Sequence, residues 1–256
     1  MALRISTPRI ICGSVAIAIG AYTVAAYRSI STVPQKSLKC SLTVSDAFST
    51  SHTYTKLINP KSHGFAKDSR SISLRLPKDK AASYSDEMLL SAALRGFFGG
   101  WVFSPERIAL GLLNIGVGPF PGVSPATPSP SISKVSQLSS AHIARPPTTF
   151  YNAFQVVHSN IADGSKPSSD SIVDVAFGSP TSGFSGCHRL CLNRQPTEDG
   201  ADETINIALE CVAGNPSQDK RVGPGVVMVF HRAYADLLFR DAVAEVKRQT
   251  SAQVSS

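Results

Sequence analysis

The chain has 256 residues, of which 25 are basic and 18 acidic, a formal net charge of +7 and a hydrophobic fraction of 42%. Once targeting and linker segments are set aside, roughly 180 to 200 residues remain, which is enough for one domain with a substantial core. Five basic residues lie in the first 45 positions, where no acidic residue occurs, so residues 46–256 carry a net charge of only +2. Without a basic stripe interleaved with aromatics, this part of the chain lacks the surface expected of a nucleic-acid-binding protein.

The start of the chain is predicted to enter or cross a membrane. Residues 10–27 form an uncharged run, IICGSVAIAIGAYTVAAY, with Arg4 and Arg9 before it and Arg28 directly after it. A helix of this length is about the shortest that spans a hydrocarbon core of about 30 Å. Three interpretations stay open: a signal anchor, a secretory signal cleaved after Ala26, and a mitochondrial presequence that carries an inner-membrane anchor.

These patterns divide the chain into three parts. Residues 1–30 are predicted to be a membrane anchor or targeting segment, residues 31–50 a tether rich in Ser, Thr and Lys, and residues 51–250 a single domain. The expected location is a membrane of the endoplasmic reticulum or secretory pathway, with the mitochondrial inner membrane as the alternative. Positive charge flanks the apolar run on both sides, so it does not predict the orientation. The cysteines are interpreted as thiols, because four of them outside the apolar run are too few for a disulfide framework.

The domain is predicted to begin with a strand and two helices. Residues 71–77, SISLRLP, alternate apolar and polar side chains, as a half-buried strand does. A helix follows, with Ser85 as its N-cap, acidic residues in its first turn and Gly96 at its end. A second helix has Ser104 as N-cap, a proline at its first position and Gly116 beyond its end.

The second half of the domain is predicted to be a loop, a set of strands and a long helix. Residues 118–148 contain the seven prolines and seven serines that mark a loop, lid or insertion. Four strands are then expected, at residues 150–160, 171–178, 186–192 and 205–212. The short turn-forming segments between them make neighbouring strands antiparallel. Residues 231–248 carry an apolar stripe at helical spacing and form the final helix.

The predicted fold class is therefore α+β, with an antiparallel sheet, two short helices after the first strand and a long C-terminal helix. This order of elements resembles that of helix-grip proteins over about residues 71–248. In those proteins a curved sheet wraps the last helix around an apolar cavity. The resemblance implies an internal cavity, and it implies no particular function.

Two histidines on strands are candidates for proton transfer. Alternation places His188 on the same face as Leu190, and His158 on the same face as Phe154 and Val156. A neutral imidazole on an apolar face can act as a base near neutral pH. The structural alternative for either histidine is a core residue that is hydrogen-bonded to the backbone.

His231 and Tyr234 are the other catalytic candidates, since their spacing places both on one side of the final helix. The glycine- and aromatic-rich run 96–101, GFFGGW, either packs in the core or lets a flat apolar ligand approach the backbone. Cys187 and Cys191 would lie about 13 Å apart along a strand, too far to share a zinc ion. The GxSxG, HExxH, P-loop and GxGxxG motifs are absent. We therefore expect no metal or cofactor.

Three functions are compatible with these features. The leading hypothesis is a membrane-associated, cofactor-independent isomerase, cyclase or dehydratase that acts on an apolar small molecule such as a polyketide, terpenoid or acyl derivative. The alternatives are a non-catalytic module that binds a lipid or small ligand, and a structural or assembly protein of an organelle membrane. An enzyme requires at least two of the candidate side chains to converge on one cavity, whereas a binding module requires only the cavity.

Overall fold

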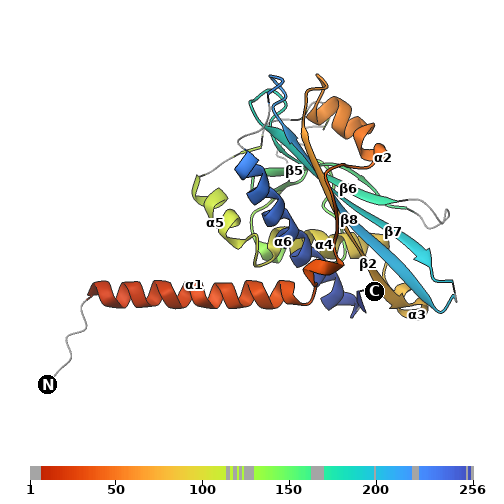
Figure 1. The fold of residues 1–256 in the computed structure, drawn as a ribbon, viewed down its shortest axis with the longest axis horizontal. Helices are drawn as coiled ribbons and strands as arrows, with labels where there is room; N and C mark the ends of the chain where they lie inside the picture. Colours follow the sequence, from red (N-terminus) through yellow and green to blue (C-terminus); the bar gives the residue numbers. More distant parts are fainter. Residues whose placement is uncertain are drawn as a thin grey trace.

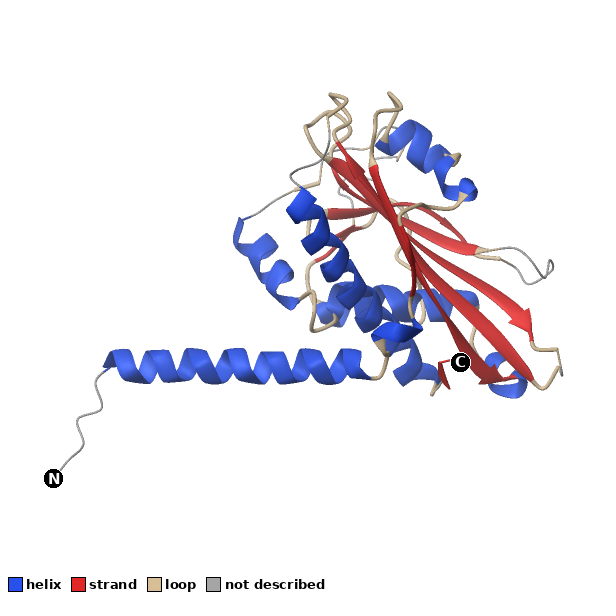
Figure 2. Cartoon of the chain, in the orientation of Figure 1, coloured by secondary structure: helices blue, strands red, loops and turns tan. Residues whose placement is uncertain are grey.

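The structure, a computed structural model, describes residues 7–113, 116–117, 120, 123, 130–162, 170–198, 200–220, 225–251 and 253–254. It has the predicted α+β class, with one large sheet and a long C-terminal helix (Figures 1 and 2). The strands are β1 (Lys39–Ser41), β2 (Ala66–Pro77), β3 (Ser131–Ile132), β4 (Thr149–Phe150), β5 (Phe154–Asn160), β6 (Ser171–Gly178), β7 (Ser185–Pro196), β8 (Asp202–Gly214) and β9 (Gln253–Val254). The helices are α1 (Thr7–Ser31), α2 (Asp46–Ser49), α3 (Lys78–Ala81), α4 (Asp86–Gly99), α5 (Ser104–Leu113) and α6 (Gly225–Thr250), with the shorter turns η1 (Gln35–Ser37), η2 (Thr53–Ile58) and η3 (Val135–Gln137).

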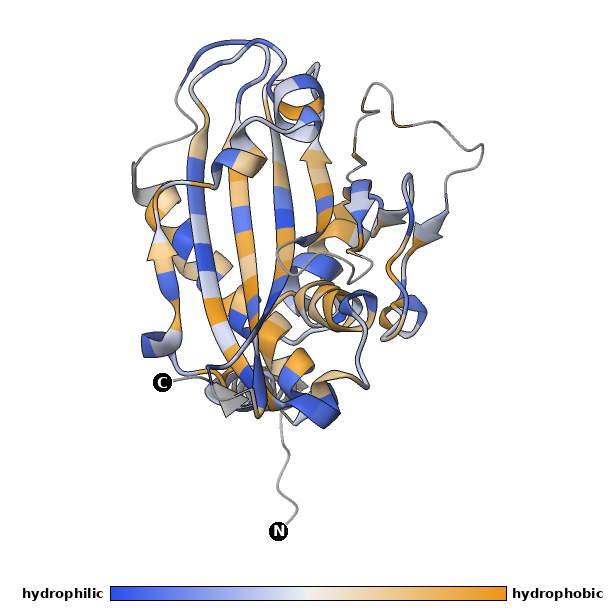
Figure 3. Cartoon of the chain, turned by 90° about the vertical axis from the view of Figure 1, so that its right-hand side faces the viewer, coloured by the Kyte–Doolittle hydropathy of each residue, from blue (hydrophilic) through white to orange (hydrophobic). Residues whose placement is uncertain are grey.

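Within the described residues the strands form one sheet in the order β1-β2-β8-β7-β6-β5-β4-β3, and β9 pairs with β2. The sheet is mixed rather than purely antiparallel as expected, because β3 pairs with β4 in parallel. The four long central strands, β2, β8, β7 and β6, are antiparallel neighbours. Hydrophobic and hydrophilic residues alternate along them (Figure 3), and successive side chains of a strand point to opposite faces of the sheet.

Helices cover both faces of the sheet. Helices α4, α5 and α6 lie on one face, and α2 with η2 lies on the other (Figure 1). The larger hydrophobic core lies between the sheet and α4 and α6, and a smaller one lies under α2 and η2. Helices α4 and α6 cross closely at Gly96, where an added Cβ would lie 2.6 Å from the carbonyl oxygen of Asp241. The glycine expected to end α4 therefore lies inside the helix and permits this contact.

Local sequence signals explain where several elements begin. The Ser85 side chain accepts a hydrogen bond from the backbone N–H of Met88 at 3.2 Å, as the predicted N-cap of α4 should. Strand β2 begins five residues before the predicted strand, at Ala66. Within the predicted loop at 118–148, residues 118–119, 121–122 and 124–129 lie outside the described residues. The described residues of this segment contain only β3 and η3 as regular structure.

The segment expected to be a tether packs against the body instead. Val33 and Phe48 are fully buried, and β1 extends the sheet. The guanidinium of Arg240 on α6 donates to the backbone oxygens of Val33 at 2.7 Å and Ile30 at 3.1 Å, which fixes the end of α1. Helix α1 projects away from the body (Figure 2). The first six residues of the predicted targeting segment lie outside the described residues. Among the residues that the structure does describe, no helix has the length and hydropathy needed to cross a bilayer.

Candidate active site

A cavity of about 350 Å³ lies between the sheet and helices α4, α5 and α6. This volume falls within the range of small-molecule sites. Its lining is mainly aromatic and aliphatic, with a few polar groups. The lining residues are Phe97, Phe103, Glu106, Gly116, Ala153, Phe154, Phe177, Gly178, Phe184, His188, His231, Tyr234, Ala235 and Leu238.

Phenylalanine rings surround the imidazole of His188. The ring centroids of Phe177, Phe97 and Phe154 lie 4.8, 5.3 and 6.3 Å from that of His188. The sequence makes room for one of them at Gly186, because a Cβ there would lie 2.2 Å from the ring of Phe177. The position of the Phe177 ring in the aromatic wall therefore depends on a glycine on the neighbouring strand β7.

His188 is held as a neutral imidazole. Burial, together with the nearby His231 and Arg70, lowers its pKa to about 3. Its Nδ1 lies 3.2 Å from the sulfur of Cys211, its direct neighbour on β8. Burial raises the pKa of the Cys211 thiol, so the thiol keeps its proton and can donate to Nδ1. In the tautomer in which Nδ1 accepts from this thiol, the imidazole proton resides on Nε2, and His188 is a hydrogen-bond donor within the aromatic wall.

A buried ionic group lies next to this wall, on β2. Asp68 and Arg70 are 3% and 2% exposed, and the guanidinium of Arg70 contacts the carboxylates of Asp68 at 2.6 Å and Asp236 at 2.7 Å. The second oxygen of Asp68 lies 3.8 Å from Nε2 of His231, just beyond hydrogen-bonding distance. Burial lowers the pKa of His231 and the Asp68 carboxylate opposes that effect. The pair therefore places a neutral imidazole beside a carboxylate that would stabilise its protonated form.

A second polar pair comes from α6 and α5. The Tyr234 hydroxyl donates to Oε2 of Glu106 at 2.9 Å. Burial raises the pKa of Glu106, and burial together with this carboxyl raises the pKa of Tyr234. The two groups form a hydrogen-bonded acid pair at the edge of the cavity, able to donate a proton or to hold a carbonyl oxygen.

Three of the four predicted catalytic residues, His188, His231 and Tyr234, line this one cavity. The predicted face of His158 was wrong, because His158 does not share a face with Phe154 and Val156. A β-bulge inserts Val157 between Val156 and His158, which reverses the alternation beyond it. His158 is exposed and lies on the opposite face of the sheet.

Sequence reasoning missed three polar residues at or beside the cavity. Asp68 and Arg70 continue the alternation of β2 towards its start, on the same face as the buried Ile72. Carrying the period of two residues back from Ile72 would have found them. Glu106 lies in the first turn of α5, and no pattern in the sequence pairs it with Tyr234.

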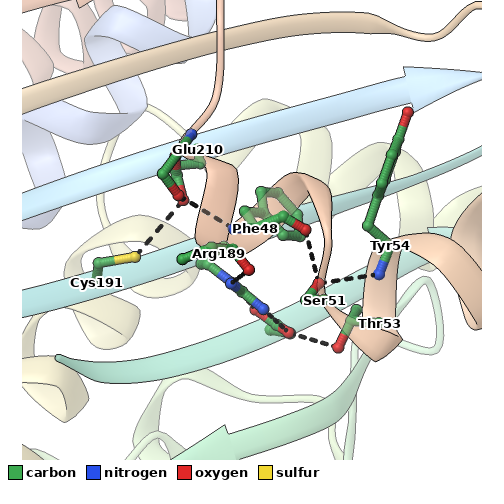
Figure 4. A network of polar contacts seen from close by, with 10 residues as sticks. Phe48, Ser51, Thr53, Tyr54, Arg189, Cys191 and Glu210 are labelled. Atoms are coloured by element: carbon green, nitrogen blue, oxygen red, sulfur yellow. Dashed lines mark hydrogen bonds and ion pairs between the residues drawn. The ribbon is translucent and has the colours of Figure 1, made fainter. Parts of the chain in front are cut away.

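The opposite face of the sheet carries a different polar network, under α2 and η2 (Figure 4). The guanidinium of Arg189 donates to both oxygens of Asp174, at 2.6 and 2.7 Å, and stacks over the ring of Phe48 with its carbon 4.3 Å from the centroid. Thr53 donates to the same carboxylate at 2.6 Å, and Ser45 donates to Glu210 at 3.0 Å. These groups satisfy one another, which is the pattern of a structural polar layer.

Cys40, Cys187, Cys191 and Cys211 are free thiols. In the part of the chain that the structure describes, no group of three or more histidine, cysteine, aspartate and glutamate side chains is arranged to hold a metal ion. Comparison of the chain with protein-family models, with curated proteins and with solved structures gives no match.

Proposed function

We propose that the protein is a membrane-associated, cofactor-independent enzyme of the isomerase, cyclase or dehydratase type. Its substrate would be an apolar small molecule, such as a polyketide, terpenoid or acyl derivative. The observation that carries the proposal is the convergence of His188, His231 and Tyr234 on one aromatic cavity. An aromatic lining selects a flat apolar ligand, and a few convergent polar groups orient it.

The polar groups suit different roles. His231 is the better base, because Asp68 lies 3.8 Å away and would stabilise the imidazolium that forms. His188 has a pKa of about 3, too far below neutral pH for an efficient base, and serves better as a hydrogen-bond donor. With Glu106 protonated and donating to the Tyr234 oxygen, the Tyr234 hydroxyl would turn to donate to a carbonyl oxygen of the substrate. The raised pKa of Glu106 favours this protonated state.

In the simplest reaction, His231 removes a proton from the carbon next to this carbonyl. The negative charge moves onto the oxygen held by Tyr234, and the proton returns at another carbon of the conjugated system. No electrons leave the substrate, so the isomerisation needs no oxidant or reductant. In a dehydration, the same base removes the proton and a hydroxyl leaves as water after protonation by the Tyr234 and Glu106 pair.

Two further features belong to the proposal. The order of strand, helices, antiparallel strands and final helix, with a cavity between the sheet and α6, is consistent with a helix-grip arrangement. Helix α1 would anchor the body to a membrane of the endoplasmic reticulum or secretory pathway, or to the mitochondrial inner membrane. The uncharged run at 10–27 supports this anchoring.

Solvent deuterium incorporation tests the catalytic proposal directly. The purified full-length chain, incubated with an apolar metabolite extract in deuterated water, should introduce deuterium into one metabolite, as detected by mass spectrometry. His231→Gln and Tyr234→Phe should reduce the incorporation rate by about 10²-fold or more, the scale of general acid–base catalysis. His158→Gln is the matched control, since this histidine is exposed on the other face of the sheet. Equal incorporation by wild type and His231→Gln would overturn the assignment.

A non-catalytic ligand-binding module is the second candidate. It is favoured by the lining, in which aromatic and aliphatic residues outnumber the polar groups, and by the low pKa of His188. A metabolite that copurifies with the chain, without deuterium incorporation, would support this function. If the chain neither copurifies with a metabolite nor incorporates deuterium, the third function remains, a structural or assembly role at an organelle membrane.

A further inference from the structure

Helix α5 presents its apolar side to solvent. Ile108, Leu112 and Leu113 are 63%, 80% and 66% exposed. The polar side chains of the same helix face the body, where Arg107 donates to a backbone oxygen at the end of α4 and Glu106 lines the cavity. A surface helix normally has the reverse arrangement, with apolar residues towards the core. The outer face of α5 therefore has the composition of a contact surface.

The apolar surface extends onto the start of α6. Val229 and Phe230 are 63% and 73% exposed and directly precede the cavity residue His231 on that helix. The two helices lie side by side (Figure 1) and are joined by the hydrogen bond from Tyr234 to Glu106. We call the five side chains of Ile108, Leu112, Leu113, Val229 and Phe230 the apolar rim.

A groove next to α5 indicates what covers this rim. It has a volume of about 800 Å³ and lies between the end of α1, the end of α4 and the second half of α6. Trp101, the single tryptophan, is 51% exposed in it, and α5 begins three residues later. Basic side chains from all three helices outnumber the acidic ones in its lining: Arg28, Arg95, Lys247 and Arg248 against Asp241 and Glu245. Glu245 pairs with both Arg95 and Arg248, and the lining keeps a net positive charge.

Tryptophan and basic residues of this kind gather where a protein meets lipid headgroups. Here they lie at the end of α1, a helix whose residues 10–27 carry no charge. Helix α1 projects on the side of the body where α5 lies (Figure 1). A soluble partner would match an apolar rim alone, whereas a bilayer matches the rim, the aromatic and basic groove and the uncharged helix together.

We propose that the apolar rim docks on an anionic phospholipid bilayer, with Trp101 and the basic groove at the level of the headgroups. Helix α5 then lies in the interface like an amphipathic helix, with Ile108 and Leu112 towards the acyl chains. Because Glu106 and Tyr234 come from the two docked helices, the cavity beneath them lies next to the lipid. Apolar ligands dissolved in the bilayer would enter there. That last step rests on the proposed function, and the docking does not.

Depth-dependent quenching of a single tryptophan tests the docking. The full-length chain carrying Trp101→Phe and Leu112→Trp is bound to vesicles of phosphatidylcholine and phosphatidylserine with brominated acyl chains. We expect the introduced tryptophan to emit at shorter wavelength than in water and to lose most of its emission to bromine. The matched control combines Trp101→Phe with Leu42→Trp, because Leu42 is 63% exposed beyond β1, away from the rim. This control should keep its emission.

Each other result would overturn the proposal. Unquenched emission at the wavelength found in water would show that α5 faces solvent. Short-wavelength emission that is not quenched by bromine and that depends on protein concentration would show that a second copy of the chain covers the rim. Equal quenching at both positions would mean unspecific adsorption, and equal quenching without phosphatidylserine would remove the role of anionic headgroups. A chain that docks yet incorporates no deuterium would refute the catalytic function and leave the docking intact.

Discussion

Replacing His188 by glutamine should make the protein less sensitive to acid. In the folded chain burial lowers the pKa of this imidazole to about 3, against 6.5 for the unperturbed group. Between these values the unfolded state binds a proton that the folded state does not, so the free energy of unfolding falls as the pH falls. Above pH 6.5 both states are neutral and the histidine contributes no pH dependence.

The size of the effect follows from the same two values. Each pH unit below 6.5 lowers the free energy of unfolding by about 1.4 kcal/mol until the pKa of the folded state is reached. At about pH 5 the free energy of unfolding is therefore lower by about 2 kcal/mol. This is an upper limit, because the ring is only partly buried and solvent at the cavity reduces the cost. His188→Gln keeps a polar side chain beside Cys211 but cannot take up the proton. Glu106 contributes with the opposite sign, since its raised pKa stabilises the folded state on acidification.

Urea unfolding in mild detergent, followed by the single tryptophan, measures the free energy of unfolding at about pH 7.5 and about pH 5. Wild type should lose up to about 2 kcal/mol more than His188→Gln between the two conditions. His142→Gln is the control, because that side chain is 79% exposed. If wild type and His188→Gln lose the same free energy, the imidazole is not held neutral in the cavity and its role as a donor is refuted.

Two further predictions concern packing and charge. Gly96→Ala should destabilise the fold by about 1–3 kcal/mol, because the added methyl meets α6 at 2.6 Å, whereas Gly111→Ala, with open space around it, should be neutral or stabilise by up to about 1 kcal/mol. Thermal unfolding monitored by circular dichroism compares the two. Arg189→Met should cost about 3–5 kcal/mol by leaving the carboxylate of Asp174 buried without its cation, and Arg248→Gln, at an exposed pair, should cost less than about 1 kcal/mol. Equal losses for the latter two variants would contradict the structural role given to the buried pair.

Much of the fold could be predicted because local signals agree with tertiary packing in most of the chain. Strand β6 has its predicted bounds, and the N-cap serine starts α4 as expected. The helical segments α2 and η2 were missed, because their sequence is short and polar and their burial depends on contacts with the far side of the sheet. Phe48 is fully buried there, yet one phenylalanine among serines and threonines gives no periodic signal.

The candidate site shows the same limit at single residues. Alternation placed His188 on the cavity side because β7 is regular around it. It failed for His158 because one extra residue, Val157, reverses the faces, and nothing in the sequence FQVVHSN marks the bulge. The pairing of Glu106 with Tyr234 joins residues 128 apart in the chain, so only the packing of α5 against α6 brings it about.

The polar groups on the two faces of the sheet differ in how fully they are hydrogen-bonded, and this difference indicates where the site lies. On the face under α2, Asp174 receives donors from Arg189 and Thr53, so little bonding capacity is left for a ligand. On the cavity face, Nε2 of His231 is 3.8 Å from Asp68, too far for a hydrogen bond. The His231 side chain is 31% exposed, so its ring nitrogens can bond to a ligand that enters the cavity. The chemistry should therefore be sought under α6, where a ligand can complete the hydrogen bonding.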